Sequence, residues 1–180
     1  VLADGSGGVV GAASAAIEPV SWESSRLKPL PQGDPLQQAI EALEKGRILA
    51  IKGVGGYHLV CDAANDEAVR TLRQRKRRPH KPLAVMFSSA GDDARMELTK
   101  VAQVDDKTWE SLSQPGRPIV LLRKSDQYDL APSIAPGLQD IGVMLAYSPL
   151  HALMLRQFGG PLVATSGNLS GEPVITSRKM

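Results

Sequence analysis

The densest chemical signal in the sequence is a basic segment that ends at Lys81. After Glu67 no acidic residue interrupts it, so its cations repel one another unless an anion or distant acidic groups approach. Arginine supplies forked donors and lysine a compact charge, which suits phosphate oxygens. The segment therefore predicts a polyanion site, most simply for the phosphates of a nucleotide. The alternative is a solvated helix end, where each cation gains only about 0.3–1 kcal/mol. Its members are Arg70, Arg73, Arg75, Lys76, Arg77, Arg78 and Lys81.

Helical periodicity divides this basic segment. Pro79 ends helical geometry by the residue before it, so the segment is part helix and part turn. Arg70, Arg73 and Arg77 share one helical face, which we expect to be solvated or to steer ligands inward. The remaining cations point elsewhere.

A glycine-rich loop is the second signal, and it directly follows an apolar run. Glycines let the backbone approach a ligand and expose its N–H groups. The spacing is neither that of a P-loop nor that of a dinucleotide fingerprint, and a tight turn between two strands explains it equally well. Its residues of interest are Lys52, Gly53, Gly55, Gly56, Tyr57 and His58.

The third signal follows the last apolar run and offers hydroxyl and amide groups at Thr165, Ser166 and Asn168. Ligands of open α/β sheets bind at the carboxyl ends of strands, which favours a binding loop over a plain Gly/Ser loop. His58 and His151 are candidates for polar contacts or for satisfied structural histidines. Cys61 follows Leu59 and Val60 and is expected to be buried rather than nucleophilic.

Alternating helical and strand patterns must position these loops. Asp34, Asn65 and Ser148 are expected N-caps of three helices, and Gly46 is the expected end of the first. Further helical segments are expected within 91–112. Strands are expected at 47–52, 83–87, 118–122, 142–145 and 161–164, and 125–141 reads as a long, Pro-rich loop of the kind that is often functional. This pattern predicts an α/β fold with a mixed, largely parallel sheet and helices packed on it.

Composition narrows the function classes. The 180 residues suffice for one domain with a core, and residues 1–33, rich in Gly, Ala, Ser and Pro, read as a linker or a loosely packed extension before the domain at 34–180. One cysteine and three histidines assemble no metal site at the usual ligand spacings. No apolar run has the roughly 20 residues that cross a bilayer, and the lone cysteine agrees with a reducing compartment. We therefore expect a cytoplasmic protein without membrane contact.

Several of these motifs together resemble one known family. The segments Lys52-Gly-Val-Gly-Gly-Tyr-His-Leu-Val-Cys-Asp-Ala63, Leu72-Arg-Gln-Arg-Lys-Arg-Arg-Pro-His-Lys-Pro-Leu-Ala-Val-Met86, Gly142-Val-Met-Leu-Ala-Tyr-Ser-Pro-Leu-His151 and Thr165-Ser-Gly-Asn-Leu-Ser-Gly-Glu-Pro173 resemble the YrdC-like domain of HypF-type carbamoyltransferases. The resemblance runs from about residue 34 to 175. Because the family pattern continues past Met180, it implies a C-terminally truncated domain with a YrdC-like twisted sheet.

The resemblance implies an adenylate-forming site. The superfamily signatures Lys-x-Arg and Ser-x-Asn fall on Lys76/Arg78 and Ser166/Asn168. They imply that ATP, with Mg²⁺, and carbamoyl phosphate yield carbamoyl adenylate. Lys76, Arg78 and Lys81 are then expected at the phosphates, and Lys52 and the backbone of 53–56 near the carbamoyl end.

The resemblance also implies partners. Other HypF domains would pass the carbamoyl group to the partner protein HypE, where it becomes the cyanide ligand of a [NiFe]-hydrogenase. Two alternatives stay open. One is the threonylcarbamoyl-adenylate synthases of tRNA modification, whose threonine-rich hydroxyls are absent here at Lys52, Gly53 and Gly55. The other is a double-stranded RNA-binding module that uses the same basic surface.

Overall fold

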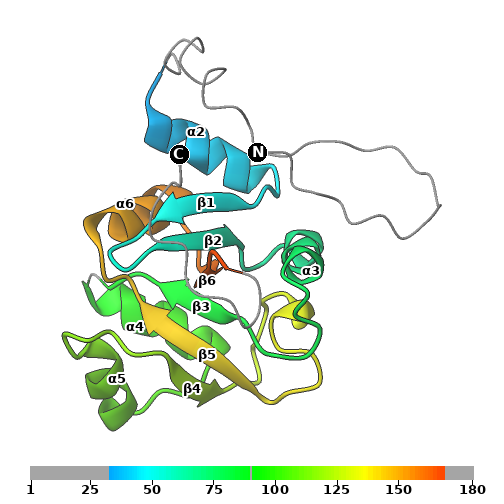
Figure 1. Ribbon diagram of the computed structural model, residues 1–180. Coiled ribbons are helices and arrows are strands. Elements are labelled where there is room, and N and C mark those ends of the chain that lie inside the picture. The colour runs from blue at the N-terminus through cyan, green and yellow to red at the C-terminus, as the bar shows by residue number, and fades with distance from the viewer. Residues whose placement is uncertain (1–32, 90, 169–180) are drawn as a thin grey trace.

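The computed structural model describes residues 33–89 and 91–168, which form an α/β fold (Figure 1). The helices are α2 (Pro35–Glu44), α3 (Asp66–Arg75), α4 (Gly91–Val101), α5 (Asp106–Ser113), α6 (Pro149–Phe158) and the short 3₁₀ helix η1 (Pro132–Ile134). The strands are β1 (Leu49–Lys52), β2 (Tyr57–Asp62), β3 (Ala84–Phe87), β4 (Val120–Arg123), β5 (Asp140–Leu145) and β6 (Leu162–Ser166). The predicted linker falls outside these residues except for Gly33.

The helix boundaries follow the capping residues that the sequence predicts. The side chains of Asp34, Asn65 and Ser148 accept hydrogen bonds from the first turns of α2, α3 and α6, at 2.9, 3.0 and 3.2 Å. Gly46 follows α2 with a φ of 70°, a left-handed conformation that ends helices at little cost in glycine. The predicted caps and the two helical pieces within 91–112 are therefore confirmed.

The six strands form one sheet in the order β1-β2-β6-β3-β5-β4. The mixed α/β class is confirmed, but the expectation of a largely parallel sheet is wrong: β3 pairs with β5 in parallel, and the four other pairings are antiparallel. Two connections explain the difference. The short segment 53–56 joins β1 to β2 as a hairpin, which only an antiparallel pair permits. Helix α3 leads from β2 to β3, but β6 lies between these strands and runs against both.

Each face of the sheet carries its own apolar core. Helices α2 and α6 cover one face through residues such as Ile40, Leu43, Met154 and Leu155. Helices α3, α4 and α5 cover the other, where alternate strand residues such as Val85 point. No helix among the described residues has the length and apolar character needed to span a membrane.

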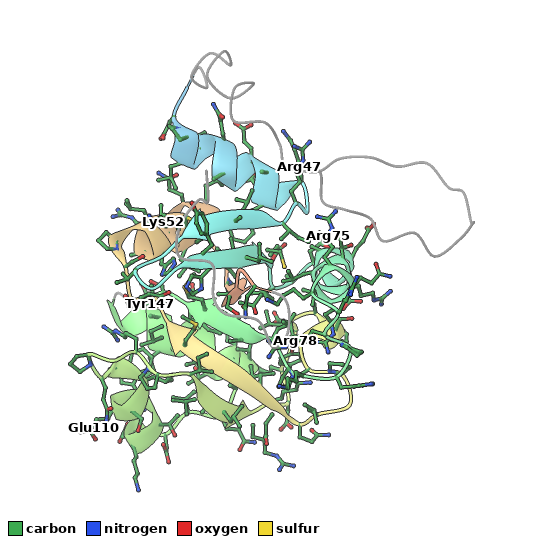
Figure 2. All side chains as sticks on the ribbon, viewed as in Figure 1. Arg47, Lys52, Arg75, Arg78, Glu110 and Tyr147 are labelled. Atoms are coloured by element: carbon green, nitrogen blue, oxygen red, sulfur yellow. The ribbon has the colours of Figure 1, made fainter. Side chains whose placement is uncertain are left out.

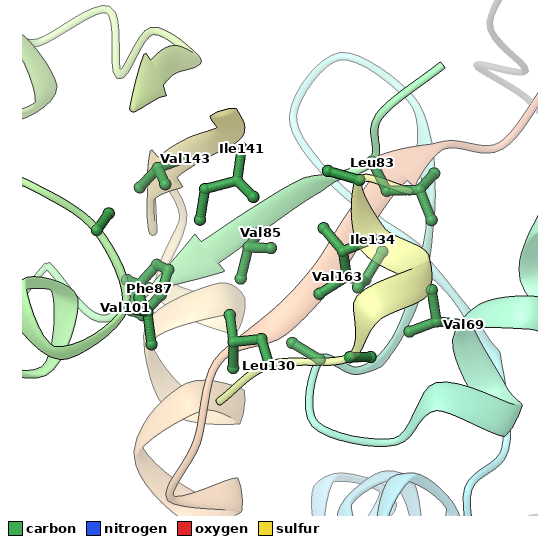
Figure 3. Packing of buried hydrophobic residues seen from close by; sticks show 14 of the residues in the cluster. Val69, Leu83, Val85, Phe87, Val101, Leu130, Ile134, Ile141, Val143 and Val163 are labelled. Carbon is green, nitrogen blue, oxygen red and sulfur yellow. The ribbon is translucent and has the colours of Figure 1, made fainter. Parts of the chain in front are cut away.

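The expected long loop 125–141 is partly a core element. Leu130 and Ile134 are buried against the α3–α5 face of the sheet, where Figure 3 shows them beside Val85 and Val163. Cys61 lies in the same core without exposure, and burial, with Asp62 adding to it, raises the pKa of its thiol to about 12. The prediction that Cys61 is buried is confirmed, and the raised pKa agrees with a thiol that is not a nucleophile.

Candidate functional site

Lys76 connects the end of α3 to the end of β6. It is the C-cap residue of α3 and only 3% exposed. Its Nζ donates hydrogen bonds to the carbonyl oxygens of Ser166, at 2.5 Å, and Asn168, at 2.7 Å. The Lys-x-Arg and Ser-x-Asn signatures, separated by about half the chain, therefore meet through this one ammonium group.

The Lys76 ammonium is buried without a carboxylate partner among the described residues. Burial, and secondarily the charge of Arg78, lowers its pKa below the ordinary lysine value. Among the described residues the ion pairs are Lys45–Glu41, Arg70–Asp66 and Arg95–Asp106, so no carboxylate pairs with Lys76 or Arg78 there. Neutral carbonyls fix the ammonium in place and leave its positive charge uncompensated.

Arg78 lies beside this contact with donor capacity left over. Its Nη2 donates to the carbonyl of Pro82 at 2.8 Å, and its buried Nε has no hydrogen-bond partner among the described residues. Lys81, the third cation expected at the phosphates, is exposed. The structure thus brings Lys76 to the Ser166–Asn168 loop, with Arg78 in the same turn after α3, and the contact of both with phosphates stays a prediction.

The expected solvated face of α3 needs a correction at one residue. Arg73 is only 8% exposed, because its guanidinium donates to the carbonyls of Pro79, at 2.6 Å, and Ile134, at 3.5 Å. Arg70 is exposed as expected, but it pairs with Asp66 one turn earlier, so the segment is not free of local neutralisation. Arg73 therefore anchors the turn after α3 to η1 rather than meeting solvent.

The glycine-rich loop is the turn between β1 and β2. The N–H of Gly53 donates to the carbonyl of Gly56 at 2.8 Å, which confirms the tight-turn interpretation. Lys52 and Gly55 are exposed, so the turn remains open to a ligand. Contact with a ligand stays a prediction for Lys52, Gly53, Gly55, Gly56 and Tyr57.

The turn and the Ser166–Asn168 loop are neighbours. His58 pairs with Ser166 in the β2–β6 register, and the N–H of Gly167 donates to the carbonyl of Tyr57 at 2.6 Å. Thr165 is 7% exposed and, one position before Ser166, points to the opposite face of the sheet. The side chains of Ser166 and His58 thus lie on one face of the sheet, and that of Thr165 lies on the other.

Two histidines and one tyrosine form a cluster behind the turn. The hydroxyl of Tyr147 and Nε2 of His58 are 2.7 Å apart, and the rings of Tyr147 and His151 meet edge to face with centroids 4.5 Å apart. A Cβ added to Gly53 would lie 2.9 Å from the His58 ring and 3.1 Å from the Tyr147 hydroxyl. The cluster therefore packs directly against the turn. Figure 2 shows Lys52 and Tyr147 at the same end of the molecule.

Sequence reasoning missed Tyr147. It is separated from His58 by 89 residues, and no spacing rule links the two. One available signal was its position two residues after the buried β5 strand, where site residues of α/β sheets often lie.

This cluster predicts a pH effect on stability. Burial, and secondarily His58, lowers the pKa of His151 to about 4, and burial also lowers the pKa of His58. In the unfolded chain histidine titrates near 6.5, so between pH 6.5 and 4 the unfolded state binds more protons. The two histidines therefore make their full contribution to the free energy of unfolding above pH 6.5, and this contribution falls as the pH drops toward 4.

Urea unfolding at pH 7, 6 and 5 measures this effect. We expect the free energy of unfolding to fall more steeply with acidity in the wild type than in His151→Gln, which has no imidazole to titrate. Carboxylates contribute equally to both proteins, so the difference between the slopes isolates the histidine. Parallel slopes would contradict the assignment.

Comparison with known proteins identifies the class of this domain. Residues 41–180 match the family model Sua5_yciO_yrdC, described as "Telomere recombination". The match covers well over half of the chain, and the chain belongs to this family.

Within the family, the chain is similar to a segment of the carbamoyltransferases HypF. It is 48% identical over 141 residues to the carbamoyltransferase HypF of Synechocystis, a match covering 78% of this chain and 18% of the relative. A solved structure described as full-length HypF in the phosphate- and nucleotide-bound form is 41% identical, with a TM-score of 0.76, over 83% of this chain and 19% of that one. The threonylcarbamoyl-AMP synthase of Photobacterium profundum is 28% identical, over 78% of this chain and 75% of that protein. The chain thus spans about a fifth of the length of its HypF relatives.

Proposed function

We propose that this domain binds ATP and forms carbamoyl adenylate as one step of a HypF-type carbamoyltransferase. The observation that supports this most strongly is the contact of Lys76 Nζ with the carbonyls of Ser166 and Asn168, which unites the two signature motifs. The nucleotide- and phosphate-bound form of the similar HypF structure agrees with a nucleotide in this family.

The cations supply electrostatic stabilisation in this proposal. Lys76 fixes the loop through two of its carbonyls, and Arg78 follows Lys76 by two residues in the turn after α3. Negative charge that develops on the phosphates would meet groups that need no reorganisation during the reaction. Arg78 is partly exposed and Lys81 is exposed, so both can approach a phosphate chain. Catalysis would consist of orientation and charge stabilisation, without a protein nucleophile.

The chemistry requires carbamate as the attacking species. Carbamoyl phosphate has no free carboxylate oxygen, so water must first cleave it to carbamate and phosphate. A carbamate oxygen then attacks the α-phosphorus of ATP. One O–P bond forms, the bond to the β-phosphate breaks, and its electron pair leaves with pyrophosphate.

The β1–β2 turn and the histidine cluster fit the carbamate end of the site. Lys52 at the mouth of the turn offers a cation to the small anion, and the backbone of 53–56 offers close approach. The turn has no side-chain hydroxyl at Gly53 or Gly55 to hold a threonine. This absence, with the higher identity to HypF, favours carbamate over threonylcarbamate.

Mg²⁺ fits this site as a companion of the triphosphate. The described residues contain no group of three or more His, Cys, Asp or Glu side chains that could hold a metal ion. Magnesium commonly keeps its waters and binds through substrate phosphates, where it neutralises charge. An ion held in this way needs no cluster of acidic side chains from the described residues.

The complete reaction of a HypF-type protein would need further domains besides this one. Other domains would supply carbamate from carbamoyl phosphate and pass the carbamoyl group from the adenylate to HypE. The short span of this chain relative to HypF is consistent with a division of the steps among domains.

Exchange of radioactive pyrophosphate into ATP tests the proposal. We expect exchange that depends on ammonium bicarbonate, which forms carbamate in solution. Exchange that requires threonine and sodium bicarbonate instead would assign the domain to the other branch. Salt-sensitive binding of double-stranded RNA without any nucleotide binding would favour the RNA-binding alternative. Arg78→Ala should weaken ATP binding at least about tenfold, the effect of losing one charged hydrogen bond, and Arg70→Ala much less.

A further inference from the structure

A second basic feature includes Arg78, and its other arginines are not used by the proposed reaction. It is a hollow of about 420 Å³ between the end of α3 and the segment after η1. Four arginines line it, Arg70, Arg73, Arg77 and Arg78, together with Pro79 and Pro136. No acidic side chain of the described residues belongs to its lining. We call it the arginine hollow.

The guanidinium groups of the hollow are oriented by neutral partners. Arg73 donates to the carbonyls of Pro79 and Ile134, and Arg78 donates to that of Pro82. Carbonyl oxygens hold a guanidinium in place but carry no net charge, so they do not neutralise the positive charge of the arginines. Arg70 is the exception, since it pairs with Asp66 and its Nε also lies 3.4 Å from the Ser133 hydroxyl. Neither Arg73, Arg77 nor Arg78 takes part in an ion pair among the described residues.

The backbone at Arg77 is strained in a way that serves this hollow. Its φ is 50°, in the left-handed region that glycine usually occupies directly after a helix. An arginine there costs backbone strain and adds a fourth cation to a cluster that already repels itself. Strain of this kind points to a functional role for the side chain.

Arg78 links the hollow to the nucleotide end of the candidate site. Its charge lowers the pKa of both Arg73, which lines the hollow, and Lys76, which holds the Ser166–Asn168 loop, each after the larger effect of burial. Its N–H donates to the carbonyl of Arg73 at 3.1 Å, and it follows Lys76 by two residues in the same turn. In Figure 2, Arg78 lies on the side of α3 away from Arg75, whose side chain does not line the hollow.

We propose that the arginine hollow binds pyrophosphate, as the exit site for the anion that adenylation releases. The identity of this ligand rests on the proposed function. Pyrophosphate leaves the α-phosphorus beside Arg78, which borders both sites, so it could transfer without crossing an uncharged surface. Forked guanidinium donors match its oxygens in pairs. The remaining arginines then compete with the active site for the product.

Isothermal titration of the full chain with sodium pyrophosphate, without ATP or carbamate, tests this site. The variant is Arg77→Gly, because glycine accepts the left-handed backbone and should leave the fold as stable as before or more so. Arg117→Gly is a matched control. Arg117 also has a positive φ, of 42°, and its loss removes the same charge, but it does not line the hollow. We expect Arg77→Gly to weaken pyrophosphate binding at least about fivefold, and Arg117→Gly less than about twofold, with ATP affinity unchanged in both.

Four results would overturn the inference. The first is that the wild type does not bind pyrophosphate, and the second is that the two glycine variants weaken pyrophosphate binding equally. The third is that Arg77→Gly loses as much ATP affinity as pyrophosphate affinity. The fourth is that adding Arg70→Ala to Arg77→Gly does not weaken pyrophosphate binding further. Equal weakening by the two glycine variants would mean that pyrophosphate responds only to the overall positive charge of the protein. An equal loss of ATP and pyrophosphate affinity would place pyrophosphate in the nucleotide site. Failure of the proposed function is distinguishable: pyrophosphate would then still bind in an Arg77-dependent way while carbamate-dependent exchange is absent.

Discussion

Lys76→Met should lower the free energy of unfolding by about 2–4 kcal/mol and abolish carbamate-dependent exchange. The ammonium makes two hydrogen bonds to carbonyls, and each bond from a charged donor contributes about 1.5–3 kcal/mol. Part of this is offset because methionine removes a buried charge that Arg78 repels. The released Ser166–Asn168 loop would no longer be positioned, and we expect exchange to fall at least about 100-fold.

The sign of the stability change separates two roles for Lys76. If it served only to contact phosphates, its removal from the free protein would relieve a buried cation and raise stability. If it holds the loop, its removal lowers stability. Urea unfolding without nucleotide measures this difference, and exchange measured on the same preparations reports function.

Arg75→Met is the matched control for Lys76→Met. Arg75 is one residue earlier, exposed, and equally cationic. We expect its replacement to change the free energy of unfolding by less than about 0.5 kcal/mol, as for most surface substitutions. A Lys76→Met protein as stable and as active as Arg75→Met would show that the loop does not depend on Lys76.

The local structure was predictable because short-range rules decide it. Asp34, Asn65 and Ser148 each cap a helix whose first turn is adjacent in the chain, so the caps could be predicted before the fold was known. The pair of Asp66 and Arg70 lies at the i, i+4 spacing and was equally accessible to sequence reasoning, although the unbroken basic run drew attention away from it.

Long-range contacts to the backbone were not predictable from residue types. Arg73 was expected on a solvated face, yet it is buried because the carbonyl of Ile134, 61 residues away, accepts its hydrogen bond. Every residue has a carbonyl, so no pattern shows which one an arginine will reach. The strand order was unpredictable for the same reason. Strand β6 lies between β2 and β3, and no local sequence pattern indicates this position.

The candidate site depends both on local sequence patterns and on long-range contacts. The turn at 53–56 and the loop after β6 were visible as glycine and hydroxyl clusters, and the family resemblance selected Lys76, Arg78, Ser166 and Asn168 from them. The structure adds that Lys76 reaches the loop through its carbonyls, and that Tyr147 joins His58 behind the turn. It also divides the basic segment: Lys76 contacts the loop, and Arg70, Arg73, Arg77 and Arg78 line a hollow after α3.

Gly167→Ala should disrupt the site through its backbone. A Cβ at this position would lie 2.9 Å from Cβ of Tyr57 and 3.0 Å from its carbonyl oxygen. Real Cβ atoms essentially never approach another heavy atom to less than 3.0 Å, and neither Tyr57 atom is the end of a flexible side chain, so the loop and β2 must separate. This separation weakens the 2.6 Å hydrogen bond from Gly167 N–H to the carbonyl of Tyr57. The φ of Gly167 lies outside the left-handed region, so the effect is steric rather than conformational.

We expect Gly167→Ala to cost about 1–3 kcal/mol, as for other overpacked sites, and to reduce exchange about 100-fold, since the loop would shift away from Lys76 and Arg78. Gly55→Ala is the matched control, because no atom lies within 4 Å of its added Cβ and its φ is not positive. That variant should keep the wild-type free energy of unfolding within about 0.5 kcal/mol. Wild-type stability and exchange in Gly167→Ala would show that the β2–loop contact is not required. A Gly55→Ala protein that stays stable but loses exchange would instead locate the substrate against the β1–β2 turn.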